Sequence, residues 1–218
     1  MDKLKEHIYK LRKDFALQAL TESSVHQNPI NQFEKWFNEA MQAQIPEVNA
    51  FDLATVSAEG IPSLRIVLLR DFSSDGFSFF TNYNSQKGKD IEANPNVCLN
   101  FFWPQMERQI RIQGIVEKLK PEDSDLYFSS RPRGSQIGAL ASAQSEVVNG
   151  REPLEQLVEK ITKELEGQEE VKRPEHWGGY MVKPAFIEFW QGRPSRLHDR
   201  IRYKKNEKGD WVFERLSP

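Results

Sequence analysis

Residues 51–71, FDLATVSAEGIPSLRIVLLRD, decide the fold. Two largely apolar runs, Phe51–Ser57 and Ser63–Asp71, flank the segment Ala58-Glu59-Gly60. Short runs rich in Val, Ile, Leu and Phe on either side of a glycine-containing turn are typical of an antiparallel hairpin. We therefore expect a β structure in which the chain turns back on itself after each strand.

The same pattern continues along the chain. Further strands are expected at residues 77–81, 96–103, 108–120, 179–190, 197–204 and 210–216. Consecutive short strands joined by tight turns favour a barrel over a parallel α/β sheet. Helices are expected at residues 3–20, 31–43, 121–130 and 152–166, with a short helix capped by Ser85 and another after Gly134. The predicted fold class is mainly β with flanking helices.

Composition limits the function classes. The chain has 218 residues, a net charge of −2 and no apolar run near the ~18 residues of a membrane span. The charged N-terminus lacks the apolar stretch of a secretory signal. We expect a cytoplasmic protein with no nucleic-acid or membrane partner.

Cys98 is the single cysteine, and its apolar neighbours favour an inert buried thiol over a nucleophile. No Cys or His set has metal-ligand spacing, so we expect no metal.

The segment Arg196–Arg200, RLHDR, combines two guanidinium groups, an imidazole and a carboxylate. On a strand, Arg196, His198 and Arg200 would share one face, with Leu197 and Asp199 on the other. A basic row of this kind can hold an anion and place a proton-active group beside it.

Other basic clusters stand apart from this segment. They are Arg65 with Arg70, Arg131 with Arg133 and Ser135, and Lys87 with Thr81. Each has a plain alternative, such as an arginine that reaches solvent at a strand end. Taken together, they suggest more than one phosphate-bearing ligand.

A polar face on the expected strand 108–120 leaves two interpretations open. Gln109, Arg111 and Gln113 alternate there with apolar residues, which suits either a ligand or subunit interface or a solvated outer face. Amide groups such as those of Gln109 and Gln144 can contact the edge of a heterocycle, and the Trp190 indole offers a flat apolar surface. Each of these three residues, taken alone, would be assigned to packing or solvent.

Seven motifs in order resemble the pyridoxine 5′-phosphate oxidase (pyridoxamine 5′-phosphate oxidase) family. They are RIVLLR at 65–70, FFTN at 79–82, ERQIRIQG at 107–114, SRPRGSQIGA at 130–139, QSE at 144–146, HWGGY at 176–180 and FWQGRPSRLHDR at 189–200. The resemblance implies an FMN-binding split β-barrel homodimer with FMN at the subunit interface. It also implies oxidation of pyridoxine or pyridoxamine 5′-phosphate to pyridoxal 5′-phosphate in vitamin B6 biosynthesis and salvage. O2 would be the acceptor, H2O2 would be released, and the amine substrate would also release NH3.

The resemblance carries site roles onto matching positions. It implies FMN contacts at Arg65, Ile66, Val67, Leu68, Leu69, Arg70, Phe80, Thr81, Gln86, Lys87, Gln109, Gln144, Ser145, Trp190 and Arg200. It implies substrate contacts at Arg12, Arg70, Tyr127, Arg131, Ser135, Arg196, Leu197 and His198, with Arg196 and His198 as the catalytic pair. Residues 1–48 would form a helical segment and lid that includes Arg12, and residues 49–218 the FMN-binding domain.

Three positions depart from the family pattern. Arg70 stands where the family usually has lysine, Gln86 where it has arginine, and Phe15 where it has tyrosine. Arg and Lys differ in reach and donor geometry, Gln86 removes a charge near the FMN phosphate, and Phe15 removes a hydroxyl. These changes bear on affinity and substrate preference rather than on the flavin chemistry.

Three other functions compete with this interpretation. One is a flavin oxidase of phenazine biosynthesis on the same scaffold, which would lose the phosphate contacts of Tyr127, Arg131 and Ser135. Another is a non-catalytic vitamer-binding or flavin-storage protein, which would not need Arg196 and His198. A purely structural β-barrel module would leave the ordered motifs unexplained.

Overall fold

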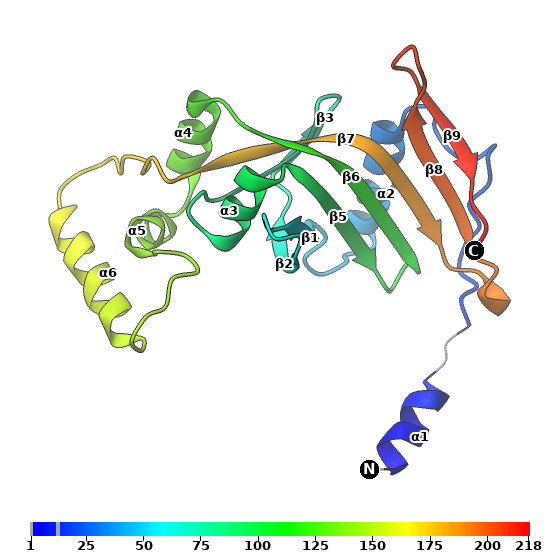
Figure 1. Ribbon diagram of the computed structural model, residues 1–218, viewed down its shortest axis with the longest axis horizontal. Coiled ribbons are helices and arrows are strands. Elements are labelled where there is room, and N and C mark those ends of the chain that lie inside the picture. Colours follow the sequence, from blue (N-terminus) through cyan, green and yellow to red (C-terminus); the bar gives the residue numbers. More distant parts are fainter. Residues whose placement is uncertain (1, 12–13) are drawn as a thin grey trace. The chain divides into compact units, whose positions relative to one another are not determined.

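The computed structural model describes residues 2–11 and 14–218. The strands in these residues are β1 (Ala50–Val56), β2 (Pro62–Leu68), β3 (Asp71–Ser73), β4 (Gly76–Asn82), β5 (Asn96–Trp103), β6 (Arg108–Lys118), β7 (Trp177–Gln191), β8 (Asp199–Lys205) and β9 (Trp211–Arg215). They form one sheet in the order β2-β1-β5-β6-β7-β4-β3, with β8 paired to β7 and β9 paired to β8 (Figure 1).

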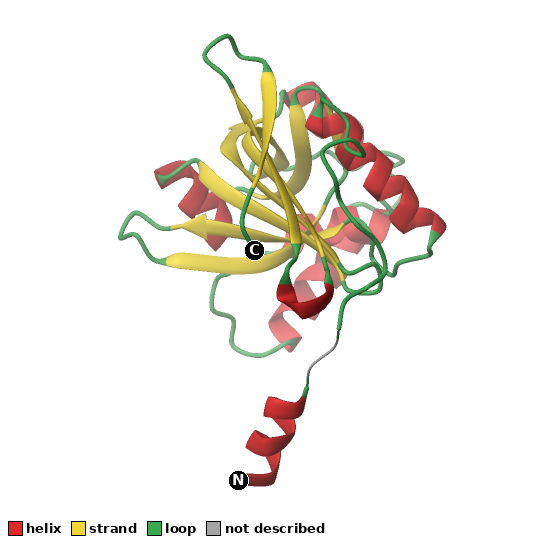
Figure 2. Cartoon of the chain, turned by 90° about the vertical axis from the view of Figure 1, so that its right-hand side faces the viewer, coloured by secondary structure: helices red, strands yellow, loops and turns green. Residues whose placement is uncertain are grey.

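Figure 2 shows the helices in red and the strands in yellow. The helices are α1 (Asp2–Lys10), α2 (Pro29–Gln42), α3 (Gln86–Ala93), α4 (Pro121–Ser130), α5 (Arg133–Ala141) and α6 (Glu152–Glu164), with a 3-10 turn at Pro194–Arg196. The predicted fold class, mainly β with flanking helices, is confirmed. Across the described residues, no helix is long and apolar enough to cross a membrane.

The chain divides into two compact units. Unit 1 contains residues 1–48, 100–112 and 186–218, and unit 2 contains residues 49–99 and 113–185. Strands β5, β6 and β7 each contribute residues to both units. The division at residue 48 into a lid segment and an FMN-binding domain stays a prediction.

Unit 2 contains the hairpin predicted from residues 51–71. Strands β1 and β2 pair antiparallel, with Ala50 opposite Leu68 and Val56 opposite Pro62. Alternate β1 residues are buried, as expected for a strand with one face on the core. The predicted cap of α3 is also present, because the Ser85 hydroxyl accepts a hydrogen bond from the Gly88 amide.

Unit 1 is organised around α2. Its N-cap Asn28 accepts a hydrogen bond from the Ile30 amide at 2.8 Å, and Pro29 occupies the first turn, where no amide donor is needed. The buried face carries Phe33 and Trp36. The ring centroid of Phe33 lies 5.3 Å from that of Phe101, and Trp36 lies 5.2 Å from Phe189. These edge-to-face contacts form the core of the unit.

The helix predicted for residues 3–20 was only half right. Helix α1 ends at Lys10, and the described residues from Asp14 to Leu20 are not helical. Tertiary contacts replace the helical hydrogen bonds there. A carboxylate oxygen of Glu107 accepts the amides of Ala16 and Leu17 at 2.9 and 3.1 Å, and Asp199 accepts the Leu20 amide at 3.0 Å. Helical periodicity in the sequence does not report such distant acceptors.

Gly114 on β6 offers a direct test of this packing. A Cβ at Gly114 would lie 2.2 Å from the Lys183 carbonyl oxygen, whereas a Cβ at Gly134 in α5 would meet nothing within 4 Å. We expect Gly114→Ala to lower the free energy of unfolding by about 2 kcal/mol or more, because backbone atoms must move. Gly134→Ala should raise it by roughly 0.5–1 kcal/mol through helix propensity. Chemical denaturation of both variants checks this, and equal stability would contradict the packing at Gly114.

Candidate active site

Unit 2 contains an open cavity of about 470 Å³ that gathers many of the predicted ligand contacts. Its lining residues are Ile66, Val67, Leu68, Arg70, Phe80, Thr81, Asn82, Lys87, Tyr127, Arg131, Ser135, Gly138, Ala139, Ser142, Gln144 and Trp177. Eight of the predicted FMN contacts are among them, and so are Arg70, Tyr127, Arg131 and Ser135, the predicted phosphate contacts of the substrate. No carboxylate occurs among these lining residues.

Three cations face this cavity, namely Arg70, Lys87 and Arg131. Burial lowers the pKa of the Lys87 ammonium, and the nearby Arg65 charge lowers it further. Burial likewise lowers the pKa of Arg131, where the positive charge of Arg70 acts in the same direction. A buried nitrogen of Arg131, Nη1, has no hydrogen-bond partner in the described part of the chain. An anionic ligand would relieve both the repulsion and the unpaired donor.

An aromatic stack forms part of the cavity lining. The Phe80 ring lies 4.0 Å from that of Tyr127 and 5.5 Å from that of Trp177, with the rings close to parallel. The Arg131 guanidinium lies 4.4 Å from the Trp177 ring centroid, within the range of a cation–π contact. A cavity that combines flat apolar rings with cations, and has no carboxylate among its lining residues, suits aromatic ligands that carry phosphate groups.

Four predicted FMN contacts of unit 2 are not in the cavity lining. Leu69 is 5% exposed and belongs to the core. The Ser145 hydroxyl accepts the Gln86 amide at 3.2 Å. The side chains of Gln86 and Arg65 are directed to a residue that the sequence analysis did not select, Asp90. FMN contact by these four residues stays a prediction.

Asp90 is a buried carboxylate, 2% exposed, on α3. Its Oδ1 accepts the Gln86 side-chain amide at 2.7 Å, and its Oδ2 accepts the Thr55 hydroxyl at 2.6 Å. Arg65 lies 3.6 Å from Asp90 and donates to Thr55 at 2.6 Å. The Asp90 carboxylate therefore holds both the Arg65 guanidinium and the Thr55 hydroxyl to which Arg65 donates. The spacing of Gln86 and Asp90, one helical turn apart, is the sequence signal that points to this contact.

Other residues that the sequence analysis did not select line the cavity. These are Asn82, Gly138, Ala139, Ser142 and Trp177. Four of the five lie within motifs FFTN, SRPRGSQIGA and HWGGY, so the motifs contained the signal although no role was assigned. The Asn82 side chain donates to the Ser142 carbonyl at 3.2 Å and thereby joins β4 to the segment after α5.

In unit 1, the segment Arg196–Arg200 does not have the predicted strand geometry. Strand β8 begins at Asp199, and a 3-10 turn precedes it. Ser195 and Arg196 have left-handed backbone conformations, with φ of 55° and 62°. The expectation that Arg196, His198 and Arg200 share one strand face was therefore wrong. The chain must reverse between β7 and β8, and the residues of the reversal cannot also be extended.

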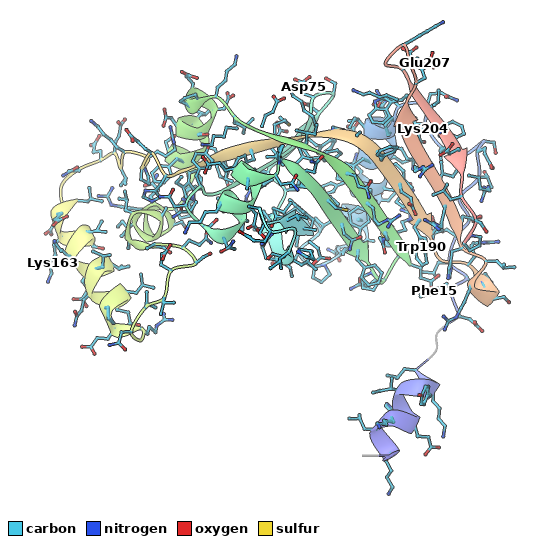
Figure 3. All side chains as sticks on the ribbon, in the orientation of Figure 1. Phe15, Asp75, Lys163, Trp190, Lys204 and Glu207 are labelled. Carbon is cyan, nitrogen blue, oxygen red and sulfur yellow. The ribbon has the colours of Figure 1, made fainter. Side chains whose placement is uncertain are left out.

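His198 packs against two aromatic side chains. Its ring centroid lies 4.6 Å from that of Trp190 and 5.8 Å from that of Phe15. Figure 3 shows Phe15 beside Trp190. The His198 Nδ1 accepts the backbone amide of Arg193 at 3.1 Å. Burial lowers the pKa of the imidazole, and the Arg196 charge lowers it further. Leu197 is 70% exposed.

Arg200 and Arg111 share the carboxylate of Glu188. Arg200 Nε donates to Glu188 at 2.8 Å, Arg111 donates to the other carboxylate oxygen, and Arg200 Nη1 donates to the Ser217 carbonyl at 2.8 Å. Burial raises the pKa of Glu188, but the hydrogen bonds from Arg200 and Arg111 outweigh it, so the pKa is lowered. The central cation of the polar face on β6 thus serves an internal ion pair. Gln109, on the same face, is half-buried.

The contacts of Asp199 are structural. It accepts the Leu20 amide at 3.0 Å and Arg215 Nη1 at 2.8 Å. Arg12, the predicted lid residue, lies outside the described residues. Within those residues, no group of three or more His, Cys, Asp or Glu side chains could hold a metal ion.

Two sequence families match this chain. Residues 37–164 match the family described as pyridoxamine 5′-phosphate oxidase. Residues 177–218 match the family described as the pyridoxine 5′-phosphate oxidase C-terminal dimerisation region. Together the two matches include the described cavity and the segment Arg196–Arg200.

Curated relatives are similar over nearly the whole chain. A pyridoxine/pyridoxamine 5′-phosphate oxidase of Cupriavidus metallidurans is 55% identical over 95% of this chain and 97% of the relative. A protein of the same name from Nostoc punctiforme is 52% identical over the same shares.

Solved structures share the fold. PhzG from Burkholderia lata, in complex with tetrahydrophenazine-1-carboxylic acid, has a TM-score of 0.86 and 26% identity, covering 93% of this chain and 100% of that chain. A pyridoxamine 5′-phosphate oxidase-related, FMN-binding protein from Nostoc punctiforme has a TM-score of 0.68 and 16% identity, covering 88% and 98%. The likeness confirms the predicted split-barrel fold.

The shared carboxylate of Glu188 generates a prediction about pH. The folded-state pKa lies below the ordinary value of 4.5, so the ion pairs stabilise the fold fully above about pH 4.5 and are lost as the pH falls through the folded-state pKa. Glu188→Gln should lower the free energy of unfolding at pH 7 by roughly 2 kcal/mol, less than for a fully buried pair because both arginines reach solvent.

Denaturation of the two proteins between about pH 7 and pH 3 measures this difference. It should shrink steadily below about pH 4.5, as the wild-type carboxylate becomes protonated. A difference that stays constant across the range would show that Glu188 contributes by packing rather than by charge.

Proposed function

The chain belongs to the pyridoxamine 5′-phosphate oxidase family, and we propose that its unit-2 cavity binds phosphate groups while Arg196 and His198 contact the substrate ring. The enzyme is an FMN-dependent oxidoreductase of vitamin B6 metabolism. It oxidises the 4′ carbon of pyridoxine 5′-phosphate or pyridoxamine 5′-phosphate to the aldehyde of pyridoxal 5′-phosphate. O2 is reduced to H2O2, and the amine substrate takes up water and releases NH3.

The observation that carries the assignment of roles is the cluster of positive charge in the cavity. Arg70, Lys87 and Arg131 line it without a carboxylate among the lining residues, and Arg131 Nη1 is buried without a partner among the described residues. Phosphate oxygens accept charge-assisted hydrogen bonds from guanidinium groups in paired geometry. We assign Arg70, Arg131, Tyr127 and Ser135 to the substrate phosphate, and Lys87 and Thr81 to the flavin.

The residues present fit FMN. The cavity offers cations for a phosphate, the Thr81 hydroxyl and the Gln144 amide for polar ring atoms, and aromatic surface on Phe80. When bound, the isoalloxazine ring accepts a hydride from the substrate carbon. The protein must hold the two rings in register, because a misplacement of about 1 Å can cost roughly 100-fold in rate. Phosphate binding at one end of the substrate provides part of that register.

The roles of the C-terminal segment follow the family resemblance. Arg196 and Leu197 contact the substrate ring, and His198 hydrogen-bonds to one of its substituents. Trp190, Arg200 and Gln109 contact the flavin, as the family resemblance implies. The ion pair of Arg200 with Glu188 supports this role, since it fixes the guanidinium in one orientation.

We further propose that the active enzyme is a homodimer with FMN at the subunit interface. The match of residues 177–218 to the family's dimerisation region supports this assembly. That segment contains Trp190, Arg196, His198 and Arg200. A cytoplasmic location and the absence of nucleic-acid and membrane partners remain predictions from the sequence.

The phenazine-type oxidase is the competing assignment, because the PhzG structure shares the fold. Identity favours the vitamin B6 oxidase: it is 55% with the Cupriavidus relative and 26% with PhzG. Tyr127, Arg131 and Ser135 together in one cavity also favour a phosphorylated substrate over tetrahydrophenazine-1-carboxylic acid, which carries no phosphate.

A single assay tests the function. The purified protein, supplied with FMN, is mixed with pyridoxine 5′-phosphate without oxygen, and its visible spectrum is followed. We expect the flavin absorbance to bleach as pyridoxal 5′-phosphate forms, and air to restore the absorbance with release of an equal amount of H2O2. A protein that binds FMN but is not bleached would refute the function.

Arg131→Ala tests the phosphate contact. We expect the KM for pyridoxine 5′-phosphate to rise by about 10- to 100-fold with a smaller change in kcat, because a ground-state contact worth about 1.5–3 kcal/mol is removed. Arg133→Ala is the charge-matched control, since its guanidinium donates to the carbonyls of Leu165 and Glu169 and does not line the cavity. A collapsed kcat with unchanged KM, or equal effects of both substitutions, would refute the role.

A further inference from the structure

We infer that His198 acts as a neutral imidazole that donates a hydrogen bond from Nε2 to the substrate, and that it is not the base of the reaction. This inference rests on the proposed function, which brings the substrate ring to His198. The inference goes beyond that function because it states which ring nitrogen of His198 carries the proton and whether the side chain can accept another.

The first step is the contact at Nδ1. The backbone nitrogen of Arg193 lies 3.1 Å from His198 Nδ1. A backbone amide can only donate, so Nδ1 must present its lone pair. The single proton of a neutral imidazole then resides on Nε2. The other ring nitrogen is therefore a donor and has no lone pair with which to accept a proton.

The second step is the rigidity of the loop that supplies the amide. Arg193 precedes the turn Pro194–Arg196, which is closed by a hydrogen bond from the Leu197 amide to the Pro194 carbonyl at 3.1 Å. Two consecutive left-handed residues, Ser195 and Arg196, lie within it. Non-glycine residues adopt this conformation at a cost, so surrounding contacts must hold it. The turn therefore keeps the Arg193 amide at Nδ1.

Contacts outside the turn hold Arg193 and the preceding glycine. Arg193 Nη1 donates to the Gln18 carbonyl at 3.1 Å, and Arg193 Nε lies 3.5 Å from Asp199. The Gly192 amide donates to the Glu107 carbonyl at 2.8 Å. A Cβ at Gly192 would lie 2.7 Å from Phe15 Cβ, so the loop and the Phe15 segment are closely packed.

The third step is the charge around the imidazole. Arg193 and Arg196 come from its own loop, and both burial and Arg196 lower its pKa. Asp199, the next residue along the chain, accepts hydrogen bonds from the Leu20 amide and from Arg215. Burial and the Arg196 charge both disfavour an imidazolium, so the neutral form is favoured.

The chemical consequence follows from these three steps. Protonation of His198 would have to occur at Nδ1 and would break the bond to the Arg193 amide. A fixed Nε2–H instead suits an acceptor oxygen or nitrogen on the substrate ring. When the hydride leaves the 4′ carbon, the proton that remains on the product oxygen passes to water, and His198 keeps its own proton throughout.

Replacing His198 by Gln or by Glu, two side chains of similar size, distinguishes a hydrogen-bond donor from a general base. Gln retains an N–H donor at the reach of Nε2, whereas Glu replaces it with a carboxylate that can only accept. We expect kcat of His198→Gln to fall by less than about 10-fold, whereas loss of a general base would lower it by about 100- to 10,000-fold. We expect kcat of His198→Glu to fall by more than about 100-fold, because the carboxylate cannot donate a hydrogen bond and would repel the substrate acceptor. An inactive Gln variant beside an active Glu variant would overturn the inference.

A second measurement does not depend on catalysis. Nitrogen NMR of the protein labelled with ¹⁵N-histidine, recorded near pH 7, reports the protonation of each ring nitrogen, and the signals missing in His198→Gln identify His198. We expect Nε2 protonated and Nδ1 unprotonated. The opposite tautomer or a doubly protonated ring would overturn the inference, even if the oxidase assay succeeds.

If the spectrum shows the expected tautomer but the protein has no oxidase activity, the assignment of the tautomer stands and only the proposed function is refuted. If both variants are inactive, the wild-type spectrum decides between the tautomers.

Discussion

Uncompensated positive charge in one cavity is the constraint on which the functional account depends. Arg70, Lys87 and Arg131 line a space of about 470 Å³ without a carboxylate among the lining residues, and burial lowers the pKa of the latter two. A fold tolerates such a cluster when a ligand supplies the missing negative charge. The antiparallel strands and the helices α4 and α5 bring residues from distant parts of the sequence to this cavity, and the aromatic stack beneath the cations provides its apolar surface.

In unit 1, by contrast, three carboxylates are paired with arginines or with backbone amides. Glu188 holds Arg111 and Arg200, Asp199 holds Arg215 and the Leu20 amide, and Glu107 holds two further amides. These contacts fix the β7–β8 loop and the segment before α2. A catalytic side chain benefits from such fixed surroundings, since its orientation and protonation state are then set before the substrate arrives.

Local signals in the sequence predicted much of this structure. The hairpin of residues 51–71 and the Ser85 cap followed from residue pattern and capping, whereas the family resemblance of the motifs named most of the residues that line the cavity. The errors have a common cause. Residues 14–20 are not helical because Glu107 and Asp199 capture their amides, and Arg196–His198 are not extended because the chain reverses there. The role of Asp90 also depends on Thr55 and Arg65, which lie on β1 and β2. Contacts between residues far apart in sequence leave no periodic trace.

The most direct test of the central claim compares pyridoxine 5′-phosphate with unphosphorylated pyridoxine as substrates of the purified, FMN-loaded enzyme. Two or more charge-assisted hydrogen bonds to the phosphate, each worth about 1.5–3 kcal/mol, predict that kcat/KM is at least ~100-fold higher for the phosphate ester. Initial rates of H2O2 formation measure it. Similar kcat/KM values for the two compounds would contradict the claim that the cavity of Arg70, Lys87 and Arg131 is a phosphate site of the oxidase.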